Sequence, residues 1–326
     1  MLLVTGGAGF IGSNVVAALN DAGRADVAVC DVLGKDGKWR NLAKRQLSDL
    51  VPPAELPGWL NGRQLEAIIH LGAISETTAT DGDLVIETNF RFSMRLLDWC
   101  TANSTRFIYA SSASTYGDGA QGFSDGHSMS TLKTLRPMNL YGWSKHLFDM
   151  AVAERAARGD KLPPQWAGLK FFNVFGPNEY HKGTMKSVLA RRFDDIKAGR
   201  PVQLFKSHRQ GIADGDQRRD FIYVDDVVRV TTWLLATPSV SGIFNVGTGK
   251  ARSFREMMLA AYAALGEAPN IQYLEMPEAI RGSYQYFTQA DIGRLQGAGY
   301  NGGFTALEEA VNTYVKSYLD QPDPFR

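Results

Sequence analysis

Tyr141 and Lys145 stand four residues apart in the segment Y-G-W-S-K. If this segment is helical, the phenol and the ammonium lie on one face of the helix, one turn apart. A free tyrosine has a pKa of about 10 and is a poor base at neutral pH. A neighbouring cation favours the phenolate, so such a pair can move a proton to or from a substrate hydroxyl. The same spacing also arises by chance on solvated helices, so the surrounding chain must supply the context.

A glycine-rich segment, T-G-G-A-G-F-I-G, directly follows the apolar run Leu2–Thr5. Gly7, Gly9 and Gly12 match G-x-G-x-x-G, and Gly6 begins the overlapping pattern G-x-x-G-x-x-G. Glycines at these positions permit a tight turn and let backbone N–H groups approach a pyrophosphate at a helix N-terminus. The order of strand, glycine loop and helix therefore predicts a dinucleotide site.

Asp31 ends the second apolar run and bears on which dinucleotide binds. An acid at this position accepts hydrogen bonds from the adenine ribose, which favours NAD. Lys35, Lys38 and Arg40 follow within nine residues. They would neutralise the 2′-phosphate of NADP, or they are solvated loop charges. The residues alone leave NAD and NADP both open.

The elements that must position these groups alternate along the first half of the chain. Short apolar runs typical of strands buried on both faces occupy Leu2–Thr5, Val27–Cys30, Ala67–Leu71, Phe107–Ala110 and Leu169–Phe172. Amphipathic segments between them cover Ser13–Ala22, Asp83–Ala102 and Tyr141–Arg158. This alternation predicts an α/β fold with a Rossmann-type, doubly wound parallel sheet.

Beyond Pro177 the pattern is less regular. A basic helix is expected at 186–197, a Gly/Asp-rich loop at 208–217, and short strands at 221–224 and 243–246 that are candidates to return to the first sheet. Ser253 with Glu256, and Thr305 with Glu308, fit the capping box that opens a helix. We therefore expect an NADP-binding Rossmann domain, 1–172 with returning segments at about 219–250. Residues 173–218 and 251–326 would form a smaller C-terminal α/β substrate domain.

Composition excludes several classes of protein. The 326 residues carry a net charge of +1, which argues against a nucleic-acid partner. No apolar run approaches the roughly 20 residues that span a bilayer. The two cysteines form no C-x-x-C pattern, and the five histidines show no paired ligand spacing. We expect a cytoplasmic protein that binds neither metal nor membrane.

With the glycine loop, the segments Y-A-S-S-A-S-T-Y-G and Y-G-W-S-K make the chain resemble the extended short-chain dehydrogenase/reductase superfamily. Its members are NAD(P)-dependent epimerases, dehydratases and reductases of nucleotide sugars. The resemblance implies that Ser112 hydrogen-bonds the reacting hydroxyl and that Tyr141 is the acid/base. It also implies that Lys145 binds the nicotinamide ribose and lowers the tyrosine pKa.

Four further stretches are similar to the ADP-L-glycero-D-manno-heptose 6-epimerase family. They are D-V-L-G-K-D-G-K-W-R-N-L, G-A-I-S-E-T-T, F-F-N-V-F-G-P-N-E-Y-H-K-G and Y-Q-Y-F-T-Q-A-D, of which H-K-G and Y-Q-Y-F-T are the most specific. This resemblance implies C6 epimerisation of an ADP-linked heptose by transient oxidation and reduction, supplying the lipopolysaccharide core. It further implies bound NADP and a homo-oligomer, with a pentamer as one option.

The same resemblance assigns residues to the site. Lys182 would be the second acid/base. Cofactor contacts would fall on Gly6, Gly9, Phe10, Ile11, Gly12, Asp31, Val32, Lys38, Leu71, Gly72, Ala73, Ile74, Ser75, Asn89, Lys145 and Val174. Substrate contacts would fall on Asn173, Thr184, Arg191, Phe205, Lys206, Ser207, His208, Arg219 and Tyr284. Two positions depart from the family, because Thr184 stands where serine is common and Arg191 where histidine occurs.

Two other readings remain at this point. A UDP-hexose 4-epimerase or a GDP-sugar 4,6-dehydratase would share the first half of the chain. Dehydratases usually place an acid after the serine, whereas Ala113, Ser114 and Thr115 offer none. A non-catalytic NADP-sensing protein is the second alternative, against which Ser112, Tyr141 and Lys145 argue.

Overall fold

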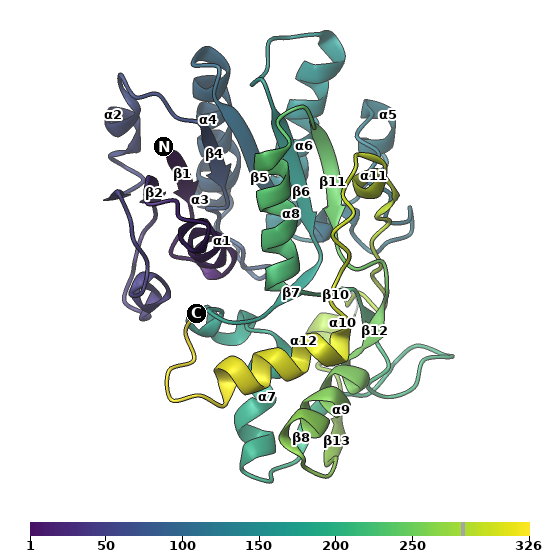
Figure 1. Ribbon diagram of the computed structural model, residues 1–326. Coiled ribbons are helices and arrows are strands. Elements are labelled where there is room, and N and C mark those ends of the chain that lie inside the picture. Colours follow the sequence, from purple (N-terminus) through teal and green to yellow (C-terminus); the bar gives the residue numbers. More distant parts are fainter. Residues whose placement is uncertain (282–283) are drawn as a thin grey trace.

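A seven-stranded parallel sheet forms the centre of the protein, in the order β11-β6-β5-β4-β1-β2-β3. The computed structural model describes residues 1–281 and 284–326, and Figure 1 shows the arrangement of the elements. The strands are β1 Leu2–Thr5, β2 Val27–Cys30, β3 Asp49–Val51, β4 Ala67–His70, β5 Arg106–Ser112, β6 Trp166–Phe171 and β11 Gly242–Val246. Strand order reverses at β1, as in doubly wound nucleotide-binding folds. The predicted α/β Rossmann-type fold is confirmed.

Helices cover both faces of this sheet, and the side chains of each strand point alternately to one face and to the other. Leu2 and Val4 of β1 pack with helices α1 (Phe10–Asp21) and α8 (Val224–Ala236) on one face. Leu3, between them, packs on the opposite face with α4 (Phe92–Ala102) and α6 (Leu140–Arg158). A parallel sheet covered on both faces needs apolar residues at every strand position, which is the pattern of these strands.

The C-terminal part of the fold lies beyond the carboxyl ends of the sheet (Figure 1). We use this name for helices α7 (Val188–Lys197), α9 (Phe254–Leu265) and α12 (Leu307–Tyr314) with the parallel strand pair β8 (Val202–Phe205) and β13 (Ile271–Leu274). These helices and strands share one hydrophobic core. Two short pairs join the halves of the molecule: β7 (Asn173–Phe175) with β10 (Phe221–Tyr223), and β9 (Arg218–Arg219) with β12 (Arg252–Ser253).

Shorter elements complete the described chain. The short helices are α2 Leu56–Leu60, α3 Gly82–Ile86, α5 Met129–Leu132, α10 Glu278–Arg281 and α11 Gly293–Gly297. Short 3₁₀ segments cover Lys38–Leu42, Ala113–Tyr116 and Tyr180–Met185, the last of which is kinked at Gly183. π-Helical turns cover Glu87–Arg91 and Val315–Leu319. None of the helices in the described ranges is long and apolar enough to cross a membrane.

Some expected elements differ from those observed. The strand expected at 221–224 is β10, which pairs with β7 rather than with the main sheet, whereas the strand expected at 243–246 is β11 and does return to it. Strand β3 was not expected. The capping box of Ser253 and Glu256 is present at α9.

The capping box expected at Thr305 is not formed, because α12 begins after Ala306 without a side-chain cap. The Thr305 hydroxyl instead donates to Asp226 Oδ1 at 2.8 Å, and the Thr305 N–H donates to Asp226 Oδ2 at 3.0 Å. Asp226 is fully buried, and a buried carboxylate requires donors. Thr305 therefore supplies hydrogen-bond donors to the buried Asp226 carboxylate instead of capping α12.

Candidate active site

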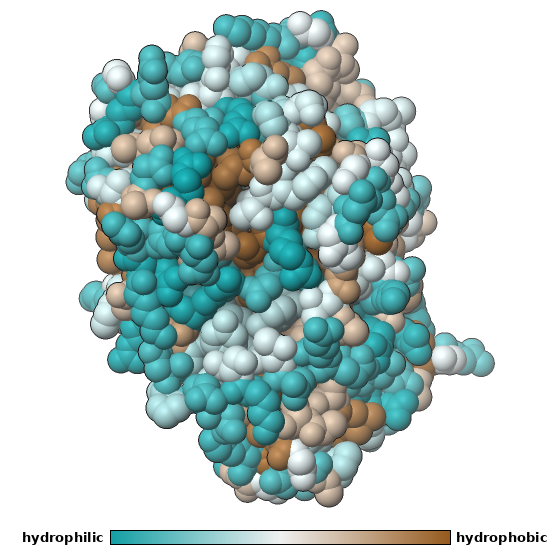
Figure 2. Space-filling model, viewed as in Figure 1, coloured by the Kyte–Doolittle hydropathy of each residue, from teal (hydrophilic) through white to brown (hydrophobic). Residues whose placement is uncertain are grey.

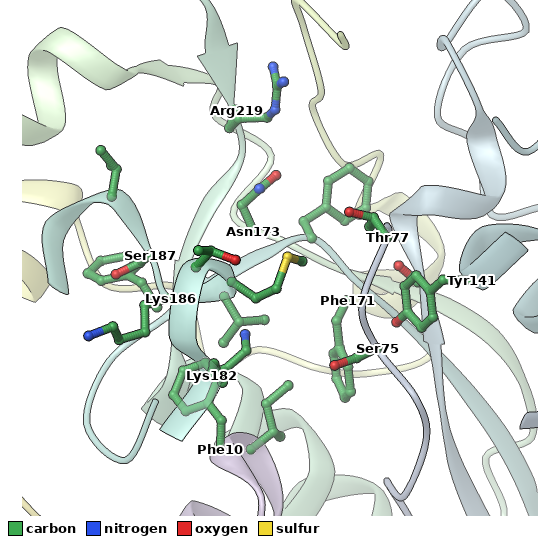
Figure 3. A pocket seen from close by; sticks show the side chains of 18 of the residues that line it. Phe10, Ser75, Thr77, Tyr141, Phe171, Asn173, Lys182, Lys186, Ser187 and Arg219 are labelled. Atoms are coloured by element: carbon green, nitrogen blue, oxygen red, sulfur yellow. The ribbon is translucent and has the colours of Figure 1, made fainter. Parts of the chain in front are cut away.

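A pocket of about 650 Å³ opens between the carboxyl ends of the sheet and the C-terminal part. The face of the molecule in Figure 2 is hollowed near its middle, where apolar side chains show between polar rims. Figure 3 shows side chains from both halves of the fold pointing into this space. In open α/β sheets the carboxyl ends of the strands are the usual place for ligands.

The glycine loop forms one end of the pocket, where β1 passes into α1. Gly6 has a φ of +68°, and a Cβ on Gly12 would lie only 2.1 Å from the carbonyl oxygen of Gly6. The loop therefore requires glycine at both positions. No side chain caps the start of α1, so its first N–H groups face the pocket end without a side-chain acceptor. This backbone fits a pyrophosphate.

Asp31 and Lys38 lie together beside the glycine loop and line the pocket. Asp31 Oδ2 accepts the N–H of Ala8 at 2.8 Å, and Asp31 Oδ1 accepts a hydrogen bond from Lys38 Nζ at 2.5 Å. Lys38 Nζ also donates to the carbonyl of Val32 at 3.1 Å. The carboxylate that would meet an adenine ribose thus has a cation beside it.

Tyr141, Lys145 and Ser112 line the same pocket from α6 and the end of β5. Helix α6 begins at Leu140, where the side-chain oxygen of Asn139 accepts the N–H of Gly142 at 2.8 Å. The predicted helical spacing of Tyr141 and Lys145 is therefore confirmed. Burial raises the pKa of the Tyr141 phenol, and its hydrogen bond with Ser112 acts in the opposite direction. Burial lowers the pKa of Lys145 to about 8.

Lys182 reaches the pocket from the other half of the fold. It lies on the turn Tyr180–Met185, which Gly183 interrupts with a φ of 53°. Its Nζ lies 5.2 Å from the centre of the Phe10 ring. Burial lowers the pKa of Lys182, and the carboxylate of Glu179 raises it. In Figure 3 Lys182 and Tyr141 approach the pocket from opposite sides, with Phe171 between them and Asn173 on the side of Arg219.

Arg219 is a buried cation at the far end of the pocket, 7% exposed. Its guanidinium lies 5.2 Å from the centre of the Tyr284 ring and 5.6 Å from that of Phe254. Its Nη1 donates to the carbonyl of Arg218 at 2.9 Å. Within residues 1–281 and 284–326 no carboxylate forms a salt bridge with it. A desolvated guanidinium without an acidic partner favours an anionic ligand.

Most of the expected site residues line this one pocket. From the cofactor set these are Gly6, Gly9, Phe10, Ile11, Gly12, Asp31, Lys38, Leu71, Gly72, Ala73, Ser75, Lys145 and Val174. From the substrate set they are Asn173, Thr184, Arg191, Phe205, Arg219 and Tyr284. The structure thus gathers groups that are up to 278 positions apart in the numbering, from Gly6 to Tyr284.

Six expected residues lie outside the pocket lining: Val32, Ile74, Asn89, Lys206, Ser207 and His208. Asn89 is buried and its side-chain amide bonds both the N–H and the carbonyl of Ile74, so it supports the segment after β4 from behind. Lys206 and His208 lie 2.9 and 3.2 Å from the carboxylate of Glu275. They turn away from the pocket because β8 ends at Phe205 and the chain then enters an exposed loop.

Several lining residues were not expected, among them Thr77, His181, Lys186, Ser187, Gln203, Gln217 and Phe254. Thr77 follows β4 two positions after Ser75, so its place after a parallel strand was a usable signal. Gln203 and Phe254 belong to the C-terminal part, whose sequence pattern carries no comparable signal. The described ranges contain no group of three or more His, Cys, Asp or Glu residues placed to hold a metal ion.

Comparisons with known proteins agree with this geometry. Residues 2–247 match the model of the NAD dependent epimerase/dehydratase family. The chain is 46% identical, over the full length of both chains, to the ADP-L-glycero-D-manno-heptose-6-epimerase of Nitratidesulfovibrio vulgaris. Among solved structures it resembles the ADP-L-glycero-D-manno-heptose-6-epimerase of Helicobacter pylori, with a TM-score of 0.81, 28% identity and coverage of 97% and 95% of the two chains.

A second solved structure that the chain resembles contains a pyridine nucleotide. The UDP-glucose 4-epimerase of Thermus thermophilus, in complex with NAD, matches with a TM-score of 0.73, 27% identity and coverage of 97% of each chain. The pocket described above and these likenesses lead to one assignment. The chain belongs to the NAD-dependent epimerase/dehydratase family and, within it, to the group of ADP-L-glycero-D-manno-heptose-6-epimerases.

Proposed function

We propose that this protein inverts C6 of the heptose in an ADP-linked glycero-manno-heptose and thereby supplies heptose for lipopolysaccharide. The observation that carries the proposal is the placement of Tyr141 and Lys182 on opposite sides of one pocket (Figure 3). Inversion of a hydroxyl-bearing carbon passes through a planar carbonyl, whose oxygen must lose and regain a proton in two positions. Two proton-transfer groups on opposite sides suit that requirement.

A pyridine nucleotide is the cofactor of this family, and when bound it supplies the hydride acceptor and donor for such an inversion. The glycine loop at the start of α1 would hold its pyrophosphate, and Asp31 its adenine ribose. Tyr141 would take the proton of the substrate hydroxyl on one face, with Ser112 orienting that hydroxyl. Lys182 would return the proton after the carbonyl has turned. Lys145 would hold the ribose and favour the Tyr141 phenolate.

The nucleotide-sugar end of the pocket would be held by Arg219, whose buried guanidinium faces the pocket without an acidic partner in the described ranges. Planar guanidinium groups bind phosphate oxygens through paired donors. Arg191 lines the same pocket and would add a second cation. Asn173, Thr184, Phe205 and Tyr284 would complete the substrate contacts.

NADP is the form of the cofactor that we propose, because Lys38 lies against Asp31. A lone carboxylate would repel a 2′-phosphate, whereas a paired cation offsets that repulsion. Mass spectrometry of nucleotide extracted from the purified protein tests this choice. We expect NADP to predominate, and a predominance of NAD would overturn the assignment.

Two broader features accompany the proposal. We infer that residues 1–172, with 219–250, bind the cofactor and that 173–218 and 251–326 bind the nucleotide sugar. We also infer that the protein forms a homo-oligomer, with a pentamer as one option. Light scattering coupled to size-exclusion chromatography would measure the mass of the oligomer. A monomeric mass at micromolar concentration would exclude the oligomer.

The substrate is tested with a panel of ADP-, GDP- and UDP-linked sugars, with products followed by NMR. We expect only the ADP-heptose to change, giving a mixture of its two C6 epimers without net oxidation of the sugar. Inversion at C4 of a UDP-hexose would instead identify a 4-epimerase. A 4-keto-6-deoxy product would identify a dehydratase.

A further inference from the structure

A fully buried ion pair lies beneath the proton-transfer residues. Asp149 of α6 and Lys170 of β6 have side chains 0% and 1% exposed, and their Oδ2 and Nζ atoms are 2.9 Å apart. We propose that Asp149, held in place by Lys170, is a positioning residue whose carboxylate keeps the Lys145 ammonium charged and fixes α6 against the end of β5. This role rests on the proposed function of Tyr141 and Lys145.

The helix itself places Asp149 behind the reacting groups. Tyr141, Lys145 and Asp149 follow one another at intervals of four residues in α6, so all three share one face of the helix. Tyr141 and Lys145 line the pocket, whereas Asp149 lies one turn deeper, in the core. Its carboxylate therefore lies deeper in the fold than the two side chains that line the pocket.

Two side chains of β5 donate hydrogen bonds to the Asp149 carboxylate. Ser111 Oγ donates to Asp149 Oδ2 at 2.6 Å, and Tyr109 OH donates to Asp149 Oδ1 at 3.1 Å. Ser111 is the residue before Ser112, and it pairs with Lys170 in the β5–β6 register. The Asp149 carboxylate thus joins the strand end that carries Ser112 to the helix that carries Tyr141.

Lys170 is held as firmly as its partner. Its Nζ donates to Thr115 Oγ1 at 2.6 Å and lies 4.8 Å from the centre of the Tyr116 ring. A carboxylate without such a counter-ion is strongly disfavoured in a protein core. Lys170 therefore stabilises the ionised form of Asp149, which burial alone would disfavour.

The surroundings of Lys145 contain few charges. Tyr141 of α6 and Ser112 of β5 line the pocket with Lys145. Asp149 lies one turn further along α6, where it pairs with Lys170 of β6, and burial together with the Lys145 charge lowers the pKa of His70 in β4. Burial favours the neutral amine of Lys145, and among the described residues only Asp149 is found to oppose this effect. Removal of the Asp149 charge should let Lys145 lose its proton at lower pH.

The test uses four variants of the full-length protein: Asp149→Asn, Lys170→Met, the double variant, and Asp98→Asn as a control. Asp98 pairs with Arg155 of the same helix α6 at 2.6 Å, but it is exposed. Lysine labelled with ¹³C at Cε and ¹⁵N at Nζ reports each titration by NMR, and Lys145→Met identifies the Lys145 signal. Urea unfolding of each variant shows that the native state is retained.

We expect Asp149→Asn to move the Lys145 titration to lower pH by about one pH unit or more. The double variant removes both charges while keeping similar volume, so it should fold well and still show the lowered titration. Lys170→Met alone leaves the Asp149 carboxylate without its counter-ion and should give the least stable protein of the set. Asp98→Asn should titrate as the unmodified protein does.

The pH profile of epimerisation gives the second readout. Activity that needs the Lys145 ammonium falls as pH rises through its pKa, so Asp149→Asn should move this alkaline limb to lower pH. An unchanged Lys145 titration in Asp149→Asn and in the double variant would overturn the proposal and leave the pair a packing role. The NMR titration needs no substrate, so it stands even if the unmodified protein proves not to be an epimerase.

Discussion

Lys182 reaches the pocket from a turn rather than from a regular helix, and its role can be separated from that of Tyr141. We expect Lys182→Met to fold and bind cofactor but to lose epimerisation, because one face of the carbonyl then lacks a proton-transfer group. A ketone analogue offered to the protein with reduced cofactor should be converted to a single stereoisomer of the secondary alcohol. Chiral chromatography of the alcohol measures this outcome.

Two comparisons sharpen the Lys182 experiment. Tyr141→Phe should favour the opposite stereoisomer, because the surviving group lies on the other side of the pocket. Lys197→Met removes an exposed lysine of α7, paired with Asp320, and should leave epimerisation unchanged. Near-normal epimerisation by Lys182→Met would mean that Lys182 only holds the substrate and that Tyr141 serves both faces.

A variant of Arg219 can distinguish substrate binding from cofactor binding. Its buried guanidinium makes no salt bridge within the described ranges, so a substrate diphosphate would be its main partner. We expect Arg219→Ala to raise KM by about tenfold or more, because hydrogen bonds to charged groups contribute about 1.5–3 kcal/mol. Arg218→Ala, which removes the exposed neighbouring side chain, is the matched control. Loss of cofactor binding with an unchanged KM would place Arg219 in the cofactor site.

At the level of strands and helices, His70 ties β1 and β4 to the start of α4. Its Nδ1 lies 2.6 Å from Thr5 Oγ1 and its Nε2 lies 2.8 Å from Ser93 Oγ. Burial lowers the pKa of His70 from 6.5 to about 3. The unfolded chain therefore binds a proton in a pH range where the folded chain does not, so folding stability is complete above about pH 6.5 and falls as pH decreases towards 3.

This linkage makes a measurable prediction. Between pH 6.5 and 4.5, His70 should contribute a slope of up to about 1.4 kcal/mol per pH unit to the free energy of unfolding. Urea denaturation at several pH values should show a shallower slope for His70→Gln, which has no group that titrates there. Parallel curves for the unmodified protein and His70→Gln would contradict a buried neutral His70.

Across the whole molecule, residues 324–326 connect segments that are far apart in the chain. The backbone carbonyl of Pro324 accepts a hydrogen bond from Tyr180 OH at 2.8 Å, and that of Phe325 accepts one from Lys44 Nζ at 2.6 Å. The Arg326 N–H donates to Asn178 Oδ1 at 3.0 Å, and its guanidinium pairs with Asp225. These contacts join the segment that carries Tyr180 and Lys182 to helix α8 and to Lys44.

We expect the double variant Phe325→Ala/Arg326→Ala to lower the free energy of unfolding by about 1–3 kcal/mol, because it removes the partly buried pairing of the Arg326 guanidinium with Asp225 and the contact of the Phe325 ring with Tyr180. Chemical denaturation measures the loss, and Lys316→Ala, an exposed residue nearby, serves as the control. If the contacts also hold the Lys182 turn, kcat should fall as well. Unfolding free energies equal to that of the control would show that the side chains of Phe325 and Arg326 contribute nothing to stability.

Features set by residues close together in the chain were predictable. The strand Leu2–Thr5, the glycine loop and the helical spacing of Tyr141 and Lys145 all agree with the structure, because each depends on side-chain size, backbone freedom or helical periodicity over a few positions. The glycine loop shows this best, since Gly12 is required by an oxygen only six positions earlier. Family resemblance then indicated Lys182, Arg219 and Tyr284, which local pattern could not.

Other features arise from contacts between residues remote in the chain. The pairing of Phe221–Tyr223 with Asn173–Phe175 and the use of Thr305 by Asp226 depend on partners 48 and 79 positions away. The fold removes both Asp149 and Lys170 from water, and each charge then offsets the cost of burying the other. A pattern read along the chain describes what each segment prefers, whereas burial of a charge is known only once the neighbouring segments are in place.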